Sequence, residues 1–188
     1  MLSPIIVNAM SDSEYQERLI EIASTRDSHE KHAKLKDFIR DVDPYGRFSV
    51  LPLAAKAAFE AKDFTLANLY ANELIQLSAQ YEDDWNFGNA IHDGNMVLGR
   101  LAAKDGKINL AVKYLHSAGS TPGSPQLNSF GPNMSLANDL LELGETESVI
   151  EYFEMCKRFW KMEDGRLDSW AASIKGGGTP YFGTHSHY

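Results

Sequence analysis

The chain has 188 residues, 43% of them hydrophobic, so it is long enough to bury a core and is expected to form one domain. Its 26 acidic and 18 basic residues give a formal net charge of −8. This charge argues against nonspecific nucleic-acid binding, because such binding needs Lys and Arg to neutralise phosphates. The single cysteine, Cys156, excludes an internal disulfide, and no run approaches the roughly 18 apolar residues of a membrane span. Residues 1–14 lack the basic start of a signal peptide, so we expect a cytoplasmic protein without a membrane segment.

Residues 1–48 are predicted to hold a pair of amphipathic helices that packs on the rest of the chain. The first is expected to be capped by Ser11 or Ser13, because a serine hydroxyl can accept from the free N–H groups of a helix start, and the second follows from Ser28. We expect the second helix to be stopped by the turn-forming sequence PYG, residues 44–46.

Residues 49–161 are predicted to form three helical pairs, because apolar residues recur there with the helical period. The expected helices cover residues 49–62 and 64–80, 84–105 and 108–118, and 133–143 and 145–161. Residues 162–188 are expected to supply a capping helix over 166–175 and an irregular tail. The fold class is therefore all-α, with about eight to nine helices.

Three segments within these pairs align without internal gaps, namely residues 54–74, 98–118 and 136–156. Small residues recur where two antiparallel helices approach closely, and Gly or Lys recurs at the turn between them. The second segment, LGRLAAKDGKINLAVKYLHSA, resembles the tetratricopeptide repeat, a helix–turn–helix unit of about 34 residues. Equivalent positions are 44 and 38 residues apart, so the resemblance implies a tetratricopeptide-like solenoid with irregular repeats. Residues 85–140 are also similar to bacterial tetratricopeptide-like proteins of unassigned function, a likeness that supplies no activity.

No sequence pattern of an active site stands out. The stretch GRLAAKDG lacks the Lys-Ser/Thr of a phosphate-binding loop, and no Ser/His/Asp order suggests an activated nucleophile. His29 and His32 share a helical spacing beside ordinary helix-start acids, and His185 and His187 lie in the tail, so we predict no metal site. Cys156 falls on a packing face and is expected to be a buried, inert thiol. We therefore predict a protein without enzymatic activity and without a cofactor.

A row of polar side chains marks the predicted helix over residues 84–105, which Asp83 or Asp84 is expected to cap. The row, at spacings of about three and so near one helical face, consists of Asn86, Asn89, His92, Asn95 and, one step on, Arg100. Asn is a mediocre helix former, because its amide competes for backbone hydrogen bonds. Two interpretations stay open: the amides tie the helix to a neighbouring loop, or they face a ligand.

The resemblance also implies where a ligand would bind, because the first helices of tetratricopeptide units line a concave groove that takes extended peptides. Lys56, Arg100 and Asn138 each follow the small residue of a first helix and are expected to face this groove. A full clamp for a peptide's carboxylate is not expected, because the positions one turn earlier, which include Met96 and Met134, contain no Lys.

The stretch GSTPGSPQLNSFGPN, residues 119–133, carries more turn chemistry than a connector needs. We expect Ser124 to cap a short turn over 125–129 and Asn133 to cap the next helix. Our interpretation is an ordered loop on the groove edge, and the alternative is a spacer whose apolar residues fill a gap between irregular repeats. An edge loop would bury Leu127 and Phe130 and would bring Gln126 and Asn128 near Asn89, His92 or Arg100. Truncating a buried Phe130 to Ala would cost roughly 3–5 kcal/mol.

These observations predict a non-enzymatic scaffold that binds a protein or peptide in its groove, with Trp85 and Phe130 as apolar anchors. Its polar contacts would come from Lys56, Asn89, His92, Arg100, Gln126, Asn128 and Asn138. The alternative is an acidic inhibitor or immunity protein that neutralises a basic toxin or nuclease, which the charge of −8 permits. A small-molecule enzyme would need a polar pocket beneath the loop. The last helix, with Leu167, Trp170 and Ile174, is expected either to cap the array or to form a homodimer.

Overall fold

The computed structural model describes residues 10–186. The predicted absence of a signal peptide rests on residues 1–14, most of which lie outside this range, as does His187. Within it the chain forms ten α helices, one 3₁₀ turn and no strand, which confirms the all-α prediction. The elements are α1 (Asp12–Ser24), α2 (Ser28–Asp41), α3 (Pro44–Glu60), α4 (Phe64–Ser78), α5 (Phe87–Lys104), α6 (Ile108–Gly119), α7 (Pro125–Phe130), α8 (Ser135–Glu142), α9 (Thr146–Cys156), α10 (Arg166–Lys175) and η1 (Gly183–Ser186).

Three predictions about helix starts were wrong. Asn133 does not cap α8, whose N-cap position is Met134; its side-chain oxygen accepts instead from the Ser135 N–H at 2.8 Å, before the first turn. Helix α2 ends before PYG as expected, but the next helix, α3, begins at Pro44 and not at residue 49, and there the Asp43 carboxylate accepts a hydrogen bond from the Gly46 N–H at 2.7 Å. Proline suits this position, because the first turn of a helix leaves its N–H groups without partners and proline has none. The carboxylate of Asp84 does not cap α5, which begins at Phe87; it accepts instead from the Asn86 N–H at 2.8 Å, within the preceding turn.

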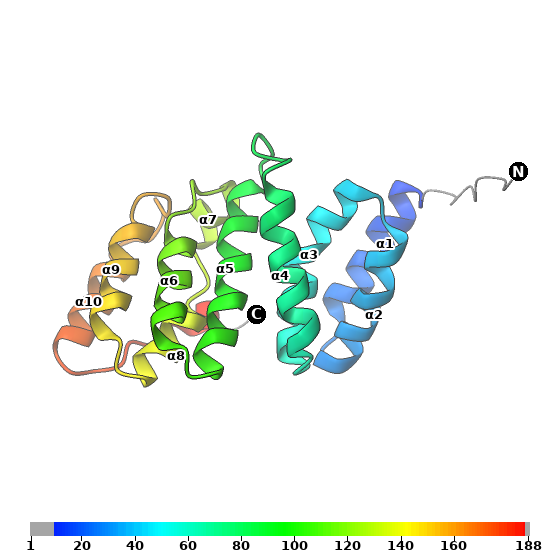
Figure 1. Cartoon of the computed structure of the whole chain (residues 1–188). Coiled ribbons are helices and arrows are strands. Elements are labelled where there is room, and N and C mark those ends of the chain that lie inside the picture. The colour runs from blue at the N-terminus through cyan, green and yellow to red at the C-terminus, as the bar shows by residue number, and fades with distance from the viewer. Residues whose placement is uncertain (1–9, 187–188) are drawn as a thin grey trace, which may run out of the picture.

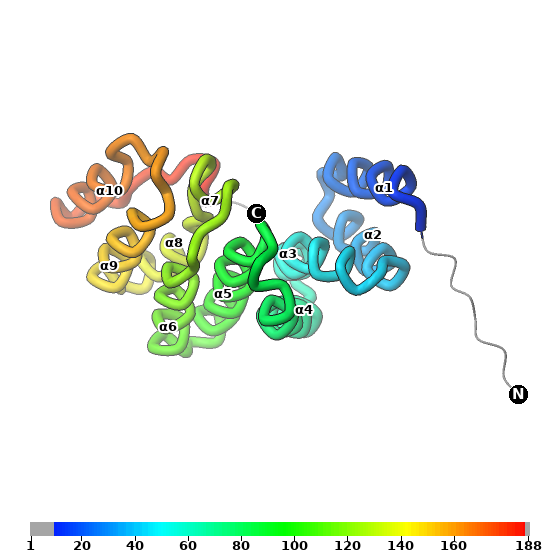
Figure 2. Tube along the Cα trace, turned by 90° about the horizontal axis from the view of Figure 1, so that it is seen from above, coloured from blue at the N-terminus to red at the C-terminus, as the bar shows by residue number. Residues whose placement is uncertain are grey.

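The helices pack as an arch. Helix α3 packs against α4 and helix α5 against α6, while α4 contacts α5 and α6 contacts α9 (Figure 1). Seen from above, α3, α5 and α8 lie on the inner side of the arch and α4, α6 and α9 on its outer side (Figure 2). Helix α7 and the tail as far as Ser186 lie within the concave side, so this side holds both the loop after α6 and the described part of the tail.

The turns within the three aligned segments share one geometry. Lys62, Gly106 and Gly144 all have positive φ, at 63°, 72° and 87°. The N–H of the residue that follows each of them donates to the carbonyl five residues earlier, at 2.9, 2.9 and 3.0 Å. This left-handed helix ending favours glycine, which has no Cβ to clash, and it explains why Gly recurs at the turn.

Helix α5 is central to the packing because it contributes to both apolar cores, one with α1–α4 and one with α6–α10. Its glycines let neighbours approach closely. A Cβ on Gly99 would lie 2.2 Å from Leu136 Cδ2, and one on Gly94 would lie 2.7 Å from Ile75 Cγ1. The inner surface of the arch is therefore anchored on a helix that is packed tightly on several sides.

The last helix and the tail cover the second core. Leu167, Trp170 and Ile174 are 0%, 9% and 7% exposed, and Phe182 of the tail packs edge-on against Trp170 at 5.0 Å between ring centroids. The apolar face offered for pairing with a second copy is thus buried within the chain itself, and self-association stays a prediction. None of the helices between residues 10 and 186 combines the length and apolarity that a membrane crossing requires.

Candidate functional site

An open hollow of about 480 Å³ lies on the concave side of the arch. Helices α3 and α5 form one side of it, α7 with residues 131–133 forms the other, and Thr184 and His185 of the tail close one end. Four of the residues predicted to contact a ligand, Lys56, Asn89, Gln126 and Phe130, line this hollow, together with the ring of His92 in its floor.

Helix α7 forms where a short turn was expected. The Ser124 hydroxyl accepts from the Leu127 N–H at 3.0 Å, and Pro125 occupies the first turn. The serine cap and the helix-starting proline expected from the sequence are therefore both present. Gly131 ends the helix with φ 81°, and a Cβ there would lie 2.4 Å from the Trp160 ring. The loop is thus held between α5 and the α9–α10 region, and its backbone is shaped by side chains on both.

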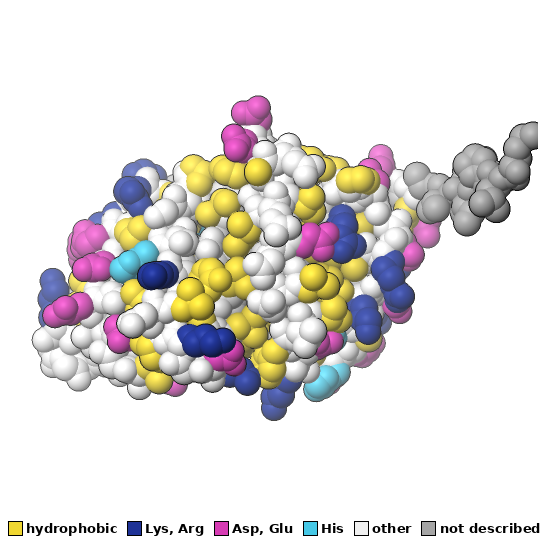
Figure 3. Space-filling view, in the orientation of Figure 1, with side chains coloured by type: hydrophobic (Ala, Val, Ile, Leu, Met, Phe, Trp, Pro, Cys, Tyr) yellow, Lys and Arg dark blue, Asp and Glu magenta, His cyan; other side chains and the backbone are white. Residues whose placement is uncertain are grey.

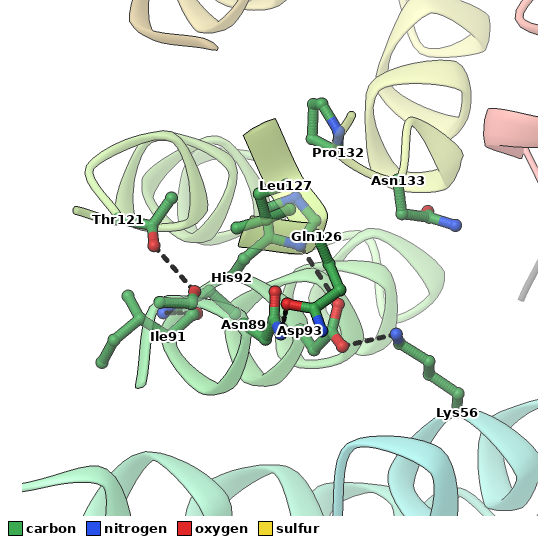
Figure 4. A network of polar contacts seen from close by, with 12 residues as sticks. Lys56, Asn89, Ile91, His92, Asp93, Thr121, Gln126, Leu127, Pro132 and Asn133 are labelled. Atoms are coloured by element: carbon green, nitrogen blue, oxygen red, sulfur yellow. Dashed lines mark hydrogen bonds and ion pairs between the residues drawn. The ribbon is translucent and has the colours of Figure 1, made fainter. Parts of the chain in front are cut away.

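The amides of α5 tie this helix to the loop. The Ser124 hydroxyl donates to Asn89 Oδ1 at 2.6 Å, and Asn89 Nδ2 donates to Gln126 Oε1 at 3.3 Å and to Asn86 Oδ1 at 2.9 Å. The Thr121 hydroxyl adds a bond to the Gly88 carbonyl at 2.7 Å. The predicted closeness of Gln126 to Asn89 is therefore confirmed (Figure 4). Asn86 and Asn89 therefore support the interpretation in which the amides tie the helix to a neighbouring loop.

Two expectations about the loop were wrong. Phe130 is 76% exposed, because α7 ends there and Gly131 turns the chain away, whereas Leu127 is 6% exposed and joins the core as predicted. The cost of 3–5 kcal/mol expected for Phe130→Ala therefore does not apply. Asn128 points away from α5, since its side-chain oxygen accepts from the Lys161 N–H at 3.1 Å.

An ion-pair network crosses the floor of the hollow. Lys56 Nζ on α3 donates to Asp93 Oδ2 on α5 at 2.5 Å, as Figure 4 shows. The other oxygen of Asp93 lies 3.1 Å from His92 Nδ1, and His92 Nε2 lies 3.1 Å from the Tyr152 hydroxyl on α9. Burial opposes ionisation of Asp93, but Lys56 and His92 outweigh it and hold its pKa at about 2. His92 is 0% exposed, so it orients Asp93 and does not face a ligand.

The remaining predicted residues lie elsewhere. Arg100 borders a separate hollow of about 280 Å³ and donates to Asp139 at 2.7 Å and Glu60 at 3.3 Å. Asn138 donates to Glu142 one turn along α8, at 3.0 Å. Trp85 is 53% exposed in the turn between α4 and α5 and does not line the hollow, although Asn86 next to it does. Neither Arg100 nor Asn138 therefore joins the set around Asn89.

Sequence reasoning missed Asp93 and the position of His185 at the end of the hollow. Asp93 directly follows His92, yet its partner Lys56 is 37 residues away, and no local pattern indicates that pairing. The tail docks through His185, whose carbonyl accepts from the Met134 N–H at 2.7 Å and whose Nδ1 lies 3.2 Å from the Pro132 carbonyl oxygen. Burial outweighs that carbonyl and lowers the pKa of His185.

The groups around the hollow offer binding contacts and no activated nucleophile. Cys156 is 0% exposed, and burial raises the pKa of its thiol far above its ordinary value. Within residues 10–186, no group of three or more His, Cys, Asp or Glu side chains is placed to hold a metal ion. Comparisons with protein-family models, with curated proteins and with solved structures found no match.

Proposed function

We propose that the chain is a non-enzymatic binding protein that holds an extended peptide in the hollow between α3, α5 and α7, which is termed the main hollow below. The observation that carries the proposal is an open concave hollow of about 480 Å³ with an aromatic side chain, Phe130, left 76% exposed at its rim. Binding sites in proteins are usually concave, a few hundred Å³ in volume, and lined by apolar walls with a few polar groups.

The lining suits a peptide. Pro52, Leu53 and Phe130 supply apolar surface for side chains, while Gln126 and Asn133 supply amide groups that match the hydrogen-bonding pattern of a peptide backbone. Covering Phe130 would contribute on the order of 1.5–3 kcal/mol, because its ring is exposed in the free protein. Because the contacts of Ser124 and Thr121 already hold the loop in place, binding would order little additional chain.

We further propose that the array is tetratricopeptide-like. The support is the shared left-handed turn at Lys62, Gly106 and Gly144, with the same hydrogen bond in all three hairpins. The placement of α3, α5 and α8 on the inner side of the arch agrees with the first helices of such units. A non-enzymatic role is supported at the same site, because Lys56, Asp93 and His92 are engaged with one another. His185, which also borders the hollow, lies with its Nδ1 against the Pro132 carbonyl.

A second candidate function rests on a different surface. The turn between α4 and α5 projects beyond the helix ends near the middle of the array, with Glu82 and Asp83 exposed and with Trp85 53% exposed (Figure 1). Figure 3 shows acidic side chains at this projection. An aromatic residue beside acids suits a basic partner, as expected for an inhibitor. Affinity there would fall steeply with salt, mainly through slower association.

The peptide proposal is tested by selecting binders from a phage-displayed library of random short peptides. Selected peptides are synthesised, and their affinities are compared for the wild type, for Gln126→Ala/Phe130→Ala and for Leu69→Ala. Leu69 is the matched control, because it is 54% exposed on α4 at the outer side of the arch. We expect at least a tenfold loss, about 1.4 kcal/mol, for the double variant and no loss for Leu69→Ala. Failure to enrich any peptide, or equal affinities for the three proteins, would contradict the proposal.

A further inference from the structure

A second, smaller hollow of about 180 Å³ adjoins the main hollow and is rich in positive charge. Leu53 and Lys56 of α3 border both hollows, so the two are continuous along this helix. Arg26, from the link between α1 and α2, and Lys31, from the first turns of α2, form the far side of the smaller hollow. Glu60 is the one acid among the residues that border it.

The charges of this hollow do not cancel. Lys56 is paired with Asp93, and Glu60 with Arg100 at 3.3 Å. The acids closest to Arg26 and Lys31 in the sequence form their contacts with other groups: Asp27 caps α2 by accepting from the Glu30 N–H at 2.8 Å, and Glu30 shares Lys34 with Glu21, each pair at 2.9 Å. Among the ion pairs formed within residues 10–186, none involves Arg26 or Lys31. Arg26 and Lys31 thus present two positive charges, neither held in an ion pair, at a concavity of a chain whose net charge is −8.

We propose that this basic hollow binds an acidic side chain of the peptide held in the main hollow. The inference rests on the proposed function and specifies its ligand: a peptide with an apolar residue near Phe130 and an Asp or Glu near Arg26 and Lys31. A guanidinium and an ammonium group are the natural partners of a carboxylate, and Arg26 can donate two parallel hydrogen bonds to it. A nucleic-acid ligand fits poorly, because a net charge of −8 repels a chain of phosphates.

The length of α3 along the two hollows also limits how far apart the apolar and the acidic residue of the peptide can be. Ser49 and Glu60 are the first and last residues of α3 that border the two hollows. At 1.5 Å per residue this part of the helix is about 17 Å long. An extended peptide covers that distance with about five residues. The apolar and the acidic residue of the ligand are therefore expected to lie no more than about five positions apart.

The probes are peptides selected from the random library by the wild-type protein, each made also with its acidic residue changed to the amide. Binding is measured by fluorescence anisotropy for the wild type, for Arg26→Glu/Lys31→Glu, and for Lys36→Glu/Lys113→Glu. The last variant has the same change in net charge on two exposed helix lysines that border neither hollow. Circular dichroism verifies that both variants fold; if either does not, the corresponding Gln variants replace it.

We expect the selected peptides to be enriched in Asp or Glu within about five positions of an apolar residue, the span set by the helix rise. Arg26→Glu/Lys31→Glu should weaken binding at least tenfold, the control less than twofold, and the amide peptides should remove this difference. Peptides without acidic enrichment, equal losses in both variants, or displacement of the peptide by inorganic phosphate at millimolar concentration would overturn the inference. The affinity of the peptides for Gln126→Ala/Phe130→Ala distinguishes failure of this inference from failure of the proposed function. If that variant still binds more weakly than the wild type, the main hollow binds peptides without an acidic subsite. If it binds equally well, both proposals fail.

Discussion

Helix α7 carries two large apolar side chains whose exposures differ by more than tenfold, 6% for Leu127 and 76% for Phe130. Replacing each with Ala therefore tests a buried and an exposed side chain of the same loop separately. Leu127 belongs to the core built by α5–α10, so its truncation removes buried methyl groups and leaves a cavity. Since α7 lies on the surface and can partly close over that cavity, we expect a loss of about 3 kcal/mol in the free energy of unfolding. Phe130→Ala should stay within about 0.5 kcal/mol of the wild type.

Urea unfolding followed by far-UV circular dichroism measures both losses, and thermal unfolding provides a second reading. For a chain of this size each 1 kcal/mol lowers the melting temperature by roughly 2–4 °C, so Leu127→Ala should melt about 6–12 °C below the wild type. Equal losses for the two variants would refute the reasoning, because they would mean that Phe130 is packed and that the loop does not present it to solvent.

Three further outcomes follow from the structure. Gly88→Ala should lower the free energy of urea unfolding by roughly 1–3 kcal/mol, because its Cβ would lie 1.8 Å from the Gly123 carbonyl oxygen, whereas Gly176→Ala, with its nearest neighbour at 3.4 Å, should be almost neutral. Asp93 has a pKa of about 2, below its ordinary 3.8, so its ionised form adds about 2 kcal/mol to the free energy of unfolding. This stabilisation is present above about pH 4 and is lost as the pH falls through 2. In an Asp93→Asn variant the free energy of unfolding should fall less between about pH 4 and pH 2 than in the wild type. If urea unfolding of the wild type were the same at both pH values, the ion pair with Lys56 would be contradicted. Cys156 should react with a thiol reagent only after unfolding, because burial raises the pKa of its thiol, and rapid reaction of the native protein would show that the site is open.

Most of the helices could be predicted from the sequence because the apolar residues of helices such as α5 and α6 repeat with a period near 3.6 over ten or more residues. The local capping signals at Ser11 and Ser124 were equally informative, since both side chains cap the helix that follows. Pro44 was misread because proline is compatible both with the end of one helix and with the first turn of the next. The choice depended on Asp43, whose carboxylate caps α3.

The site was predicted in part, because its residues come together through the stacking of hairpins. Asn89 and Gln126 were expected to be close, and they are, since a short loop returns directly to the helix it leaves. Phe130 was expected to be buried, but a helix of six residues is too short for a periodic pattern to indicate which face is buried. The spacing of residues could not place Arg26 and Lys56 at one hollow, because that arrangement depends on how α1 and α2 pack on the array.

The central claim is that the concave side of the arch binds a peptide, and an NMR titration tests it most directly. A peptide selected from the random library is added to the ¹⁵N-labelled protein, and changes in the amide resonances are mapped onto the structure. The account predicts changes along the inner faces of α3 and α5 and in α7, including the side-chain amide of Gln126. Changes confined to α4, α6 or the turn at residues 82–85 would contradict it.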